Sequence, residues 1–178
     1  MRVISGKYRG RNLVAPEGLN TRPTQDRVKE AMFSILNFKL QNAITLDLFA
    51  GSGALSIEAL SRGAKKAYIN DLSKDAINCI KKNIANVKLE EEYILTNKSY
   101  TEVLETLNEK IDVLFLDPPY KMDVYEEIIT YLINNNLLND YAYLVLEMDI
   151  NNKVIELENF TSKVYKYGTK KLQIMKRM

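Results

Sequence analysis

The sequence has no histidine and only one cysteine, Cys79. These absences exclude an imidazole base, an internal disulfide, and a zinc site built from Cys and His ligands. Any catalysis must therefore depend on carboxylates, backbone groups and the positioning of substrates, and we expect no metal site. The chain also lacks an apolar run long enough to span a membrane and a signal-peptide core near its N-terminus. We expect a cytoplasmic protein with no membrane contact.

The length and composition favour a single domain. A chain of 178 residues, 46% of them hydrophobic, suffices for one well-buried core and is short for two. No repeat, low-complexity tract or linker divides it. We therefore expect one domain over residues 1–178, with residues 1–23 as a basic extension and residues 24–178 as the core.

Charge is distributed unevenly along the chain. The net charge is +2, but residues 1–23 sum to +4, residues 163–178 to +6 and the intervening residues to −8. Basic clusters of this kind are typical of surfaces that meet a polyanion, although a short basic tail can also be merely solvated. We favour nucleic acid as the partner.

A glycine turn follows the first strongly apolar run of the chain. The apolar run ends in Asp-Leu-Phe-Ala-Gly-Ser-Gly, after which apolar residues recur at helical spacing as far as Gly63. The pattern predicts a strand, a tight turn and a helix, with the free N–H groups of the helix directed at a ligand. Two glycines let the backbone approach that ligand closely. The residues of this candidate site are Asp47, Phe49, Gly51, Ser52 and Gly53.

This turn lacks the features of two common nucleotide loops. Position 56, where a dinucleotide fingerprint has its third glycine, is Ser56, and no Gly-Lys-Ser/Thr follows for a phosphate loop. A cofactor with an adenosine part and no phosphates fits better, and S-adenosylmethionine meets that description. The alternative is an ordinary strand-turn-helix joint of an α/β protein.

Beyond the turn, strand-like and helix-like segments alternate, which predicts a parallel, doubly wound sheet. The last segments, Val164–Tyr167 and Leu172–Lys176, flank Gly168-Thr169 and predict a hairpin that adds one antiparallel strand. Two of the helices are predicted to begin at capping boxes, formed by Ser99 with Glu102 and by Asp123 with Glu126.

The N-terminal residues predict a basic β-hairpin. Met1–Ile4 and Asn12–Ala15 are typical of short strands joined by a turn with a glycine at each end. The turn carries Lys7, Arg9 and Arg11. These cations either contact nucleic acid or guard an exposed strand edge.

Two arginines, Arg22 and Arg27, flank the start of a predicted helix. Two cations beside the positive end of a helix repel that end unless an anion lies there, so a phosphate contact is expected. The alternative is an ion pair with Asp26 or Glu30.

Three acidic residues, Asp47, Asp71 and Asp117, end predicted strands. Ligands of such sheets bind beyond the carboxyl ends of the strands, so these acids should share one crevice. Asp71 lies 20 residues beyond Gly51, where a carboxylate can accept both hydroxyls of an adenosine ribose. The alternative for Asp71 is a turn aspartate before Ser73.

The sequence Asp117-Pro118-Pro119-Tyr120 follows a buried strand and is the sharpest chemical signal in the chain. The exocyclic amine of a nucleobase is a poor nucleophile, because its lone pair is delocalised, and must be aimed at a methyl donor. Asp117 and the carbonyl of Pro118 can accept its two N–H groups, the two prolines stiffen their placement, and Tyr120 offers a ring for a flipped base. The alternative is a proline strand stop with an incidental tyrosine.

The glycine turn, Asp71 and the Asp-Pro-Pro-Tyr sequence resemble the cofactor loop, ribose acid and catalytic motif of class I amino-methyltransferases. The ends of the chain are similar to the bacterial RsmD family. The segments that carry this similarity are Met1-Arg-Val-Ile-Ser-Gly-Lys-Tyr-Arg-Gly-Arg, Thr21-Arg-Pro-Thr, Asp26-Arg-Val-Lys-Glu-Ala and Tyr167-Gly-Thr-Lys-Lys-Leu.

This resemblance implies an α/β, Rossmann-like fold with a mostly parallel seven-stranded sheet, one antiparallel strand and an N-terminal β-hairpin. It implies S-adenosylmethionine as the donor, with Leu72 in the cofactor site and either Lys98 or Ser99 near the adenine, and an N-terminal hairpin and arginine helix that meet RNA. The family methylates N2 of one guanine in small-subunit ribosomal RNA. We therefore expect this rRNA, or the assembling 30S subunit, as partner of a monomeric enzyme.

The expected mechanism is direct in-line methyl transfer without a covalent intermediate, since the one cysteine lies within a helix and no second cysteine could resolve an adduct. Two other functions stay open. One is an adenine-N6 methyltransferase of DNA or RNA that uses the same four-residue motif, although the chain leaves little room for a target-recognition insertion. The other is a non-catalytic RNA-binding module, which we would expect to have lost Asp117 or the glycines.

Overall fold

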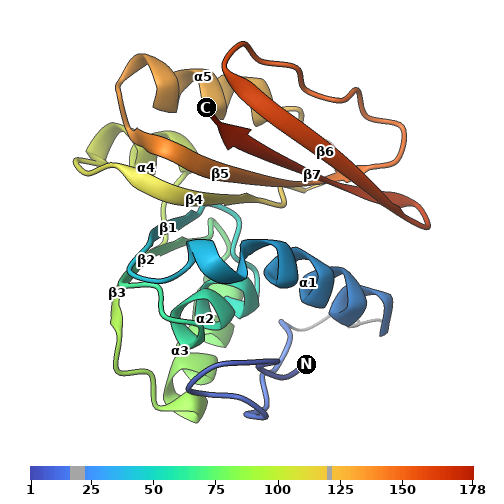
Figure 1. The fold of residues 1–178 in the computed structure, drawn as a ribbon. Coiled ribbons are helices and arrows are strands. Elements are labelled where there is room, and N and C mark those ends of the chain that lie inside the picture. Colours follow the sequence, from blue (N-terminus) through green and yellow to red (C-terminus); the bar gives the residue numbers. More distant parts are fainter. Residues whose placement is uncertain (17–22, 120–121) are drawn as a thin grey trace.

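The computed structural model describes residues 1–16, 23–119 and 122–178, and for residues 23–27 only the backbone. Among the described residues, seven strands form one sheet in the order β3-β2-β1-β4-β5-β7-β6 (Figure 1). In that part of the chain no helix has both the length and the apolar character needed to cross a membrane. The strands are β1 (Ile44–Asp47), β2 (Lys66–Asn70), β3 (Glu92–Thr96), β4 (Ile111–Leu116), β5 (Leu138–Asp149), β6 (Phe160–Tyr167) and β7 (Lys170–Arg177). The helices are α1 (Pro23–Leu36), η1 (Asn37–Lys39), α2 (Ala54–Ser61), α3 (Lys74–Val87), α4 (Tyr100–Thr106) and α5 (Tyr125–Asn134).

The sheet is parallel except for β7, which runs antiparallel to both β5 and β6. The expected mostly parallel, seven-stranded sheet with one antiparallel strand is therefore confirmed. Helices α1, α2 and α3 cover one face and α4 and α5 the other (Figure 1). Each face has its own apolar core, and the strands between the two are correspondingly rich in buried apolar residues.

The N-terminal segment reverses direction as predicted, but it forms no regular strand. One isolated antiparallel bridge joins Arg2 and Asn12. The turn bonds to α2 instead of extending the ladder, since the N–H of Lys7 donates to the carbonyl of Ser61 at 2.8 Å. A Cβ on Gly6 would lie 1.8 Å from that carbonyl oxygen, so only glycine permits the approach. Backbone hydrogen bonds from Val3 to Arg11 and from Leu13 to Met1, both 2.9 Å, still pair the two segments, so the hairpin is present but its pairing is too short for regular strands.

One of the two predicted capping boxes is present. The Ser99 hydroxyl accepts from the N–H of Glu102, and the Glu102 carboxylate accepts from the N–H of Ser99. The prediction for Asp123 was wrong. Helix α5 begins one residue later, with Val124 at its N-cap and no side-chain cap, so Asp123 lies too early to bond the first turn.

Candidate active site

Three strand ends meet at one edge of the sheet. β1 lies between β2 and β4, and the parallel register pairs Asp47 with Ile69 on one side and with Phe115 on the other. Asp71 follows β2 and Asp117 follows β4, so these acids lie on either side of the turn after β1. The structure thus brings the three predicted acids to one edge, where such sheets bind ligands.

The turn after β1 uses its two glycines differently. Gly51 has φ of 56° and a Cβ there would meet nothing within 4 Å, so its backbone conformation favours glycine and leaves open space beside it. A Cβ on Gly53 would lie 3.2 Å from the Ile80 side chain, so close packing on α3 also favours glycine there. Between them, the carbonyl of Ser52 accepts a 2.8 Å hydrogen bond from the buried amide of Asn83. Contacts with α3 therefore fix the turn, whereas the space beside Gly51 stays open.

Asp71 is fixed at this open side. One carboxylate oxygen accepts from the N–H of Gly51 at 2.8 Å, and the other accepts from the N–H of Ser73 at 2.9 Å. Each oxygen keeps a further lone pair that could accept a hydroxyl group. Leu72 next to it is 73% exposed, an unusual exposure for leucine at a strand end. The pair offers a charged acceptor beside an apolar surface.

Two asparagines that the sequence reasoning missed hold the strand ends together. The buried side chain of Asn70 donates to the carbonyls of Leu48 and Lys98 and accepts from the N–H of Lys98. Asn97 donates to the carbonyls of Asp71 and Leu72, both at 2.9 Å. These bonds set the position of Asp71 relative to the turn after β1. The one sequence signal that could have found this role was that Asn70 directly precedes Asp71.

The predicted adenine contacts, Lys98 and Ser99, lie at the end of β3. The Lys98 side chain is exposed, whereas the hydroxyl of Ser99 is engaged in its capping box with Glu102. Beside them, the ring of Phe49 packs against Tyr100 with centroids 5.8 Å apart. An adenine contact from either residue stays a prediction.

Asp47 lies beneath the turn, only 2% exposed, and accepts a 3.2 Å hydrogen bond from the Ser56 hydroxyl. Burial raises the pKa of Asp47 to about 7, with Ser56 opposing the rise and Asp117 and Asp71 adding to it. Ser56 thus replaces the third glycine of a dinucleotide fingerprint with a partner for a buried carboxyl group. In this position Asp47 supports the turn from behind, and its contact with a cofactor stays a prediction.

Asp117 and the prolines after it border a small pocket of about 20 Å³. Pro118 is buried and Pro119 exposed, so the first proline fixes the chain against the protein. Tyr120, the fourth residue of the predicted motif, lies outside the described residues. The remaining wall includes Met122, Tyr125, Glu147, Asp149, Asn152 and Lys170.

The lysine in this pocket is a site residue that sequence reasoning missed. Lys170 Nζ lies 2.7 Å from Glu147 Oε1 and 3.7 Å from Asp117 Oδ1. Burial in the pocket raises the pKa of Asp117 to about 7, Glu147 adds to the rise and Lys170 opposes it. Water that reaches the exposed 43% of the Asp117 side chain limits the rise. Lys170 belongs to the Tyr-Gly-Thr-Lys-Lys-Leu segment, which is the signal that could have found it.

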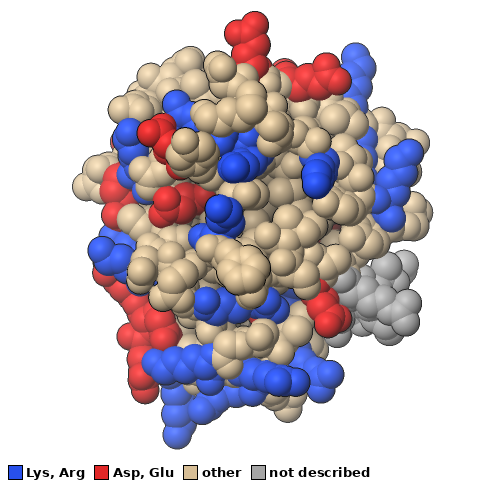
Figure 2. All heavy atoms as spheres, viewed as in Figure 1, with Lys and Arg blue, Asp and Glu red and all other residues tan. Residues whose placement is uncertain are grey.

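The predicted RNA-binding cations have different surroundings. Lys7 pairs with Glu90 and Glu91 at 2.7 and 2.9 Å, whereas Arg9 and Arg11 are exposed. The lower edge of the molecule, where the N-terminal segment lies, carries a dense row of Lys and Arg (Figures 1 and 2). Both interpretations of these cations, contact with RNA and protection of the hairpin edge, stay predictions. The remaining predicted contacts, Arg22 and the Arg27 side chain, lie outside the description.

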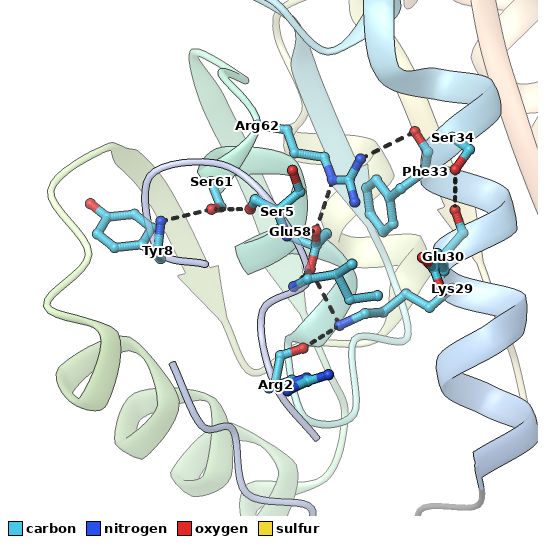
Figure 3. A network of polar contacts seen from close by, with 11 residues as sticks. Arg2, Ser5, Tyr8, Lys29, Glu30, Phe33, Ser34, Glu58, Ser61 and Arg62 are labelled. Atoms are coloured by element: carbon cyan, nitrogen blue, oxygen red, sulfur yellow. Dashed lines mark hydrogen bonds and ion pairs between the residues drawn. The ribbon is translucent and has the colours of Figure 1, made fainter. Parts of the chain in front are cut away.

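A buried carboxylate fixes the N-terminal segment on the core (Figure 3). Glu58, on α2, accepts from the N–H groups of Ile4 and Ser5 at 2.8 and 3.0 Å. Arg62 and Lys29 pair with the same carboxylate at 2.7 and 3.4 Å, which balances its buried charge. Arg9 and Arg11 are therefore exposed on a segment that is fixed to the core.

The order of the strands, the helices on both faces, the glycine turn after β1 and the acid after β2 define a class I methyltransferase fold. The family model described as Conserved hypothetical protein 95 matches residues 1–176. The chain belongs to that family, and the expected RsmD resemblance is confirmed. One relative, Ribosomal RNA small subunit methyltransferase D of Haemophilus influenzae, is 38% identical over 164 residues, which cover 90% of this chain and 85% of that protein.

Solved structures agree with this assignment. “Putative methyltransferase yhhF” from Escherichia coli matches with a TM-score of 0.88 at 30% identity, covering 99% of this chain and 97% of that chain. A more distant structure, SMU.776, is described as complexed with SAH and matches with a TM-score of 0.71 at 14% identity, over 88% of this chain and 50% of that one. The second likeness shows the fold alone.

Proposed function

We propose that this chain transfers a methyl group from S-adenosylmethionine to the exocyclic N2 of one guanine in small-subunit ribosomal RNA. The observation that carries the proposal is the position of Asp117 and Pro118 at the end of β4, next to the strand that ends in the glycine turn. The name of the Haemophilus relative, which specifies small-subunit ribosomal RNA, supports the choice of substrate.

The residues around the turn fit this donor. The open space beside Gly51 leaves room for a ligand, the free lone pairs of Asp71 suit the ribose hydroxyls, and exposed Leu72 suits one face of an adenine. The SAH described in a distant relative of the same fold supports the choice. When bound, the donor supplies an electrophilic methyl group on a sulfonium. The residues of the chain must orient the amine and accept its proton.

The role of the Asp-Pro-Pro-Tyr segment is to aim a weak nucleophile. The Asp117 carboxylate and the Pro118 carbonyl each accept one N–H of the guanine amine, which directs its lone pair at the methyl group, and Tyr120 stacks on the base. The methylated amine must then lose a proton. Asp117, whose pKa is raised to about 7, can accept that proton once the new N–C bond has formed.

No covalent enzyme intermediate is needed. Cys79 is buried on α3 and its thiol donates to the carbonyl of Val14 at 3.3 Å, so it faces the N-terminal segment rather than Asp117. Burial also raises the pKa of the Cys79 thiol, which disfavours the nucleophilic thiolate. Methyl transfer therefore proceeds directly between donor and amine.

The basic N-terminal segment and the C-terminal hairpin are proposed to hold the ribosomal RNA while the target base is presented to Asp117. We further propose that residues 1–178 act as one domain and as a monomer in the cytoplasm, on rRNA or on the assembling 30S subunit. Sedimentation of the protein at several concentrations tests the monomer, because a self-associating chain would sediment faster as its own concentration rises.

The decisive experiment incubates the enzyme and a labelled methyl donor with small subunits from cells that lack it. The RNA is then digested and the modified nucleoside is identified by mass spectrometry. N2-methylguanosine at one site supports the proposal, and a matched reaction with Asp117→Ala should show almost none. N6-methyladenosine, or label found only in DNA, would instead support the adenine-N6 alternative.

A further inference from the structure

The face of the sheet that α1 only partly covers continues over β7 and β6. Directly opposed residues of antiparallel strands share one face, and the register places Tyr143 with Lys176, and Val145 with Ile174 and Lys163. Ile174 is buried in the core beneath α1, whereas Lys163 is exposed at the outer strand. This face therefore passes from the core under α1 to solvent over β6.

Aromatic rings and cations alternate on this face. Lys176 Nζ lies 5.3 Å from the centre of the Tyr141 ring, and Lys39 Nζ lies 5.9 Å from the centre of the Tyr143 ring. Tyr141 is 63% exposed, and Phe38, next to Lys39, is 88% exposed. We name the surface the tyrosine–lysine face and define it by Phe38, Lys39, Tyr141, Tyr143, Lys163 and Lys176.

Tyr141 adopts a backbone conformation that a bulky residue rarely takes. Its φ is 64°, and it lies where the pairing of β5 with β4 shifts register between Ile111 and Val113. The left-handed conformation costs roughly 1–2 kcal/mol for a residue with a Cβ, and the exposed ring recovers little of that by burial. Strain of this kind is retained where it aims a side chain for use.

The charge of the β6–β7 hairpin indicates which class of molecule this face binds. β6 and β7 together contain no acidic residue, and three of their six cations, Lys163, Lys170 and Lys176, lie on this face of the sheet. Cations attract phosphates, and exposed aromatic rings between them provide stacking surfaces for unpaired bases. Figure 2 shows further Lys and Arg side chains across the same view of the molecule, above the row at its lower edge. The combination fits single-stranded RNA better than an apolar protein surface.

We propose that the tyrosine–lysine face binds unpaired nucleotides of ribosomal RNA that flank the target base. Lys170 at the start of β7 lies in the catalytic pocket, and Lys176 follows it by six residues, which is roughly 20 Å along a strand. The face thus leads away from Asp117 along one strand. The inference rests on the proposed function for the identity of the RNA.

The test uses Tyr141→Asn, because asparagine accepts the left-handed conformation and removes the ring. The variant should be as stable as the parent or more so in urea unfolding, while its affinity for a small-subunit rRNA transcript, measured with S-adenosylhomocysteine present, should fall roughly tenfold. Phe38→Ala should act in the same direction. Lys163→Gln should lower the slope of log affinity against log salt by about 0.7, the value for one contact with a single strand.

Matched controls lie elsewhere on the surface. Tyr93→Asn removes a tyrosine that is 39% exposed on β3, at the opposite end of the strand order, and Lys81→Gln removes an exposed lysine on α3. Neither control should change RNA affinity. Unchanged affinity in Tyr141→Asn and Lys163→Gln would overturn the proposal. So would a loss seen with assembled subunits but not with protein-free rRNA, since the face would then meet a protein.

The test of this binding surface can fail or succeed independently of the test of the proposed function. A chain that binds rRNA through this face but forms no N2-methylguanosine would refute the proposed function and leave the binding surface in place. A chain that forms N2-methylguanosine with unchanged affinity in the variants would refute the surface alone.

Discussion

The contact between Lys170 and Asp117 allows the effect of one substitution to be worked out from the structure. Lys170→Gln removes a positive charge that lies 3.7 Å from Asp117 and 2.7 Å from Glu147. Two unit charges about 4 Å apart interact by about 1 kcal/mol in water and about 4 kcal/mol at an effective dielectric constant of about 20. Because 43% of the Asp117 side chain is exposed, the smaller figure applies.

This energy corresponds to a displacement of the pH profile. One pKa unit is about 1.4 kcal/mol, so loss of Lys170 should raise the pKa of Asp117 by about 0.7 unit. Glu147, left without its cation, acts in the same direction. The ionised carboxylate is the form that accepts the amine, so kcat/KM at about pH 6 should fall about fivefold below that of the parent and recover at about pH 9.

The assay measures initial rates of methyl transfer to small ribosomal subunits across this pH range. Lys166→Gln is the matched control, because Lys166 lies on the same hairpin, is exposed, and pairs in register with Lys171 on the opposite face from Lys170. The pH profile of kcat/KM for Lys166→Gln should match that of the parent. If Lys170→Gln lowers kcat/KM equally at every pH, Lys170 does not act through the charge of Asp117 and the reasoning is refuted.

Three further predictions test other parts of the molecule. Asp71→Ala should weaken S-adenosylhomocysteine binding roughly tenfold to a hundredfold in calorimetric titration, and unchanged affinity would remove Asp71 from the cofactor site. Neutralising Arg9 and Arg11 should flatten the salt dependence of RNA binding by about one unit per contact, whereas Lys7→Gln should change it less because Lys7 already pairs with two glutamates. Because folding raises the pKa of Asp47 from 3.8 to about 7, the free energy of unfolding should fall as pH rises through that interval. Asp47→Asn should remove up to about 3 kcal/mol of this fall between about pH 5 and pH 8 in urea unfolding, because about two pKa units of the rise lie in that range, and an unchanged pH dependence would contradict the assignment.

Much of the fold could be predicted because its signals are local. Apolar strands alternate with helical periodicity, and glycine at 51 and 53 marks positive φ directly after a strand. The capping box at Ser99 was predictable for the same reason, since its partner is three residues away. The neighbouring failure at Asp123 shows the limit of such signals, because a start displaced by one residue removes the cap.

Contacts between distant residues were decided only by the tertiary structure. Lys7 was predicted to contact RNA or to guard a strand edge, and its ion-pair partners Glu90 and Glu91 lie 83 and 84 residues further along the chain. Glu58, which fixes the N-terminal segment, has its partners Ile4 and Ser5 more than 50 residues earlier in the chain. No local pattern encodes these pairs, since they depend on how α2 and α3 pack against the first residues.

The sequence by itself determined the α/β class, the glycine turn, Asp71 after β2 and Asp-Pro-Pro at the end of β4, because each depends on the conformations of consecutive residues. Only the tertiary structure decided that Lys170 and Glu147 share the pocket of Asp117, and that Tyr141 is turned outward beside Lys176. Both arrangements follow from the register of β5 against β4 and β7, and a strand register is set by packing among segments far apart in the chain.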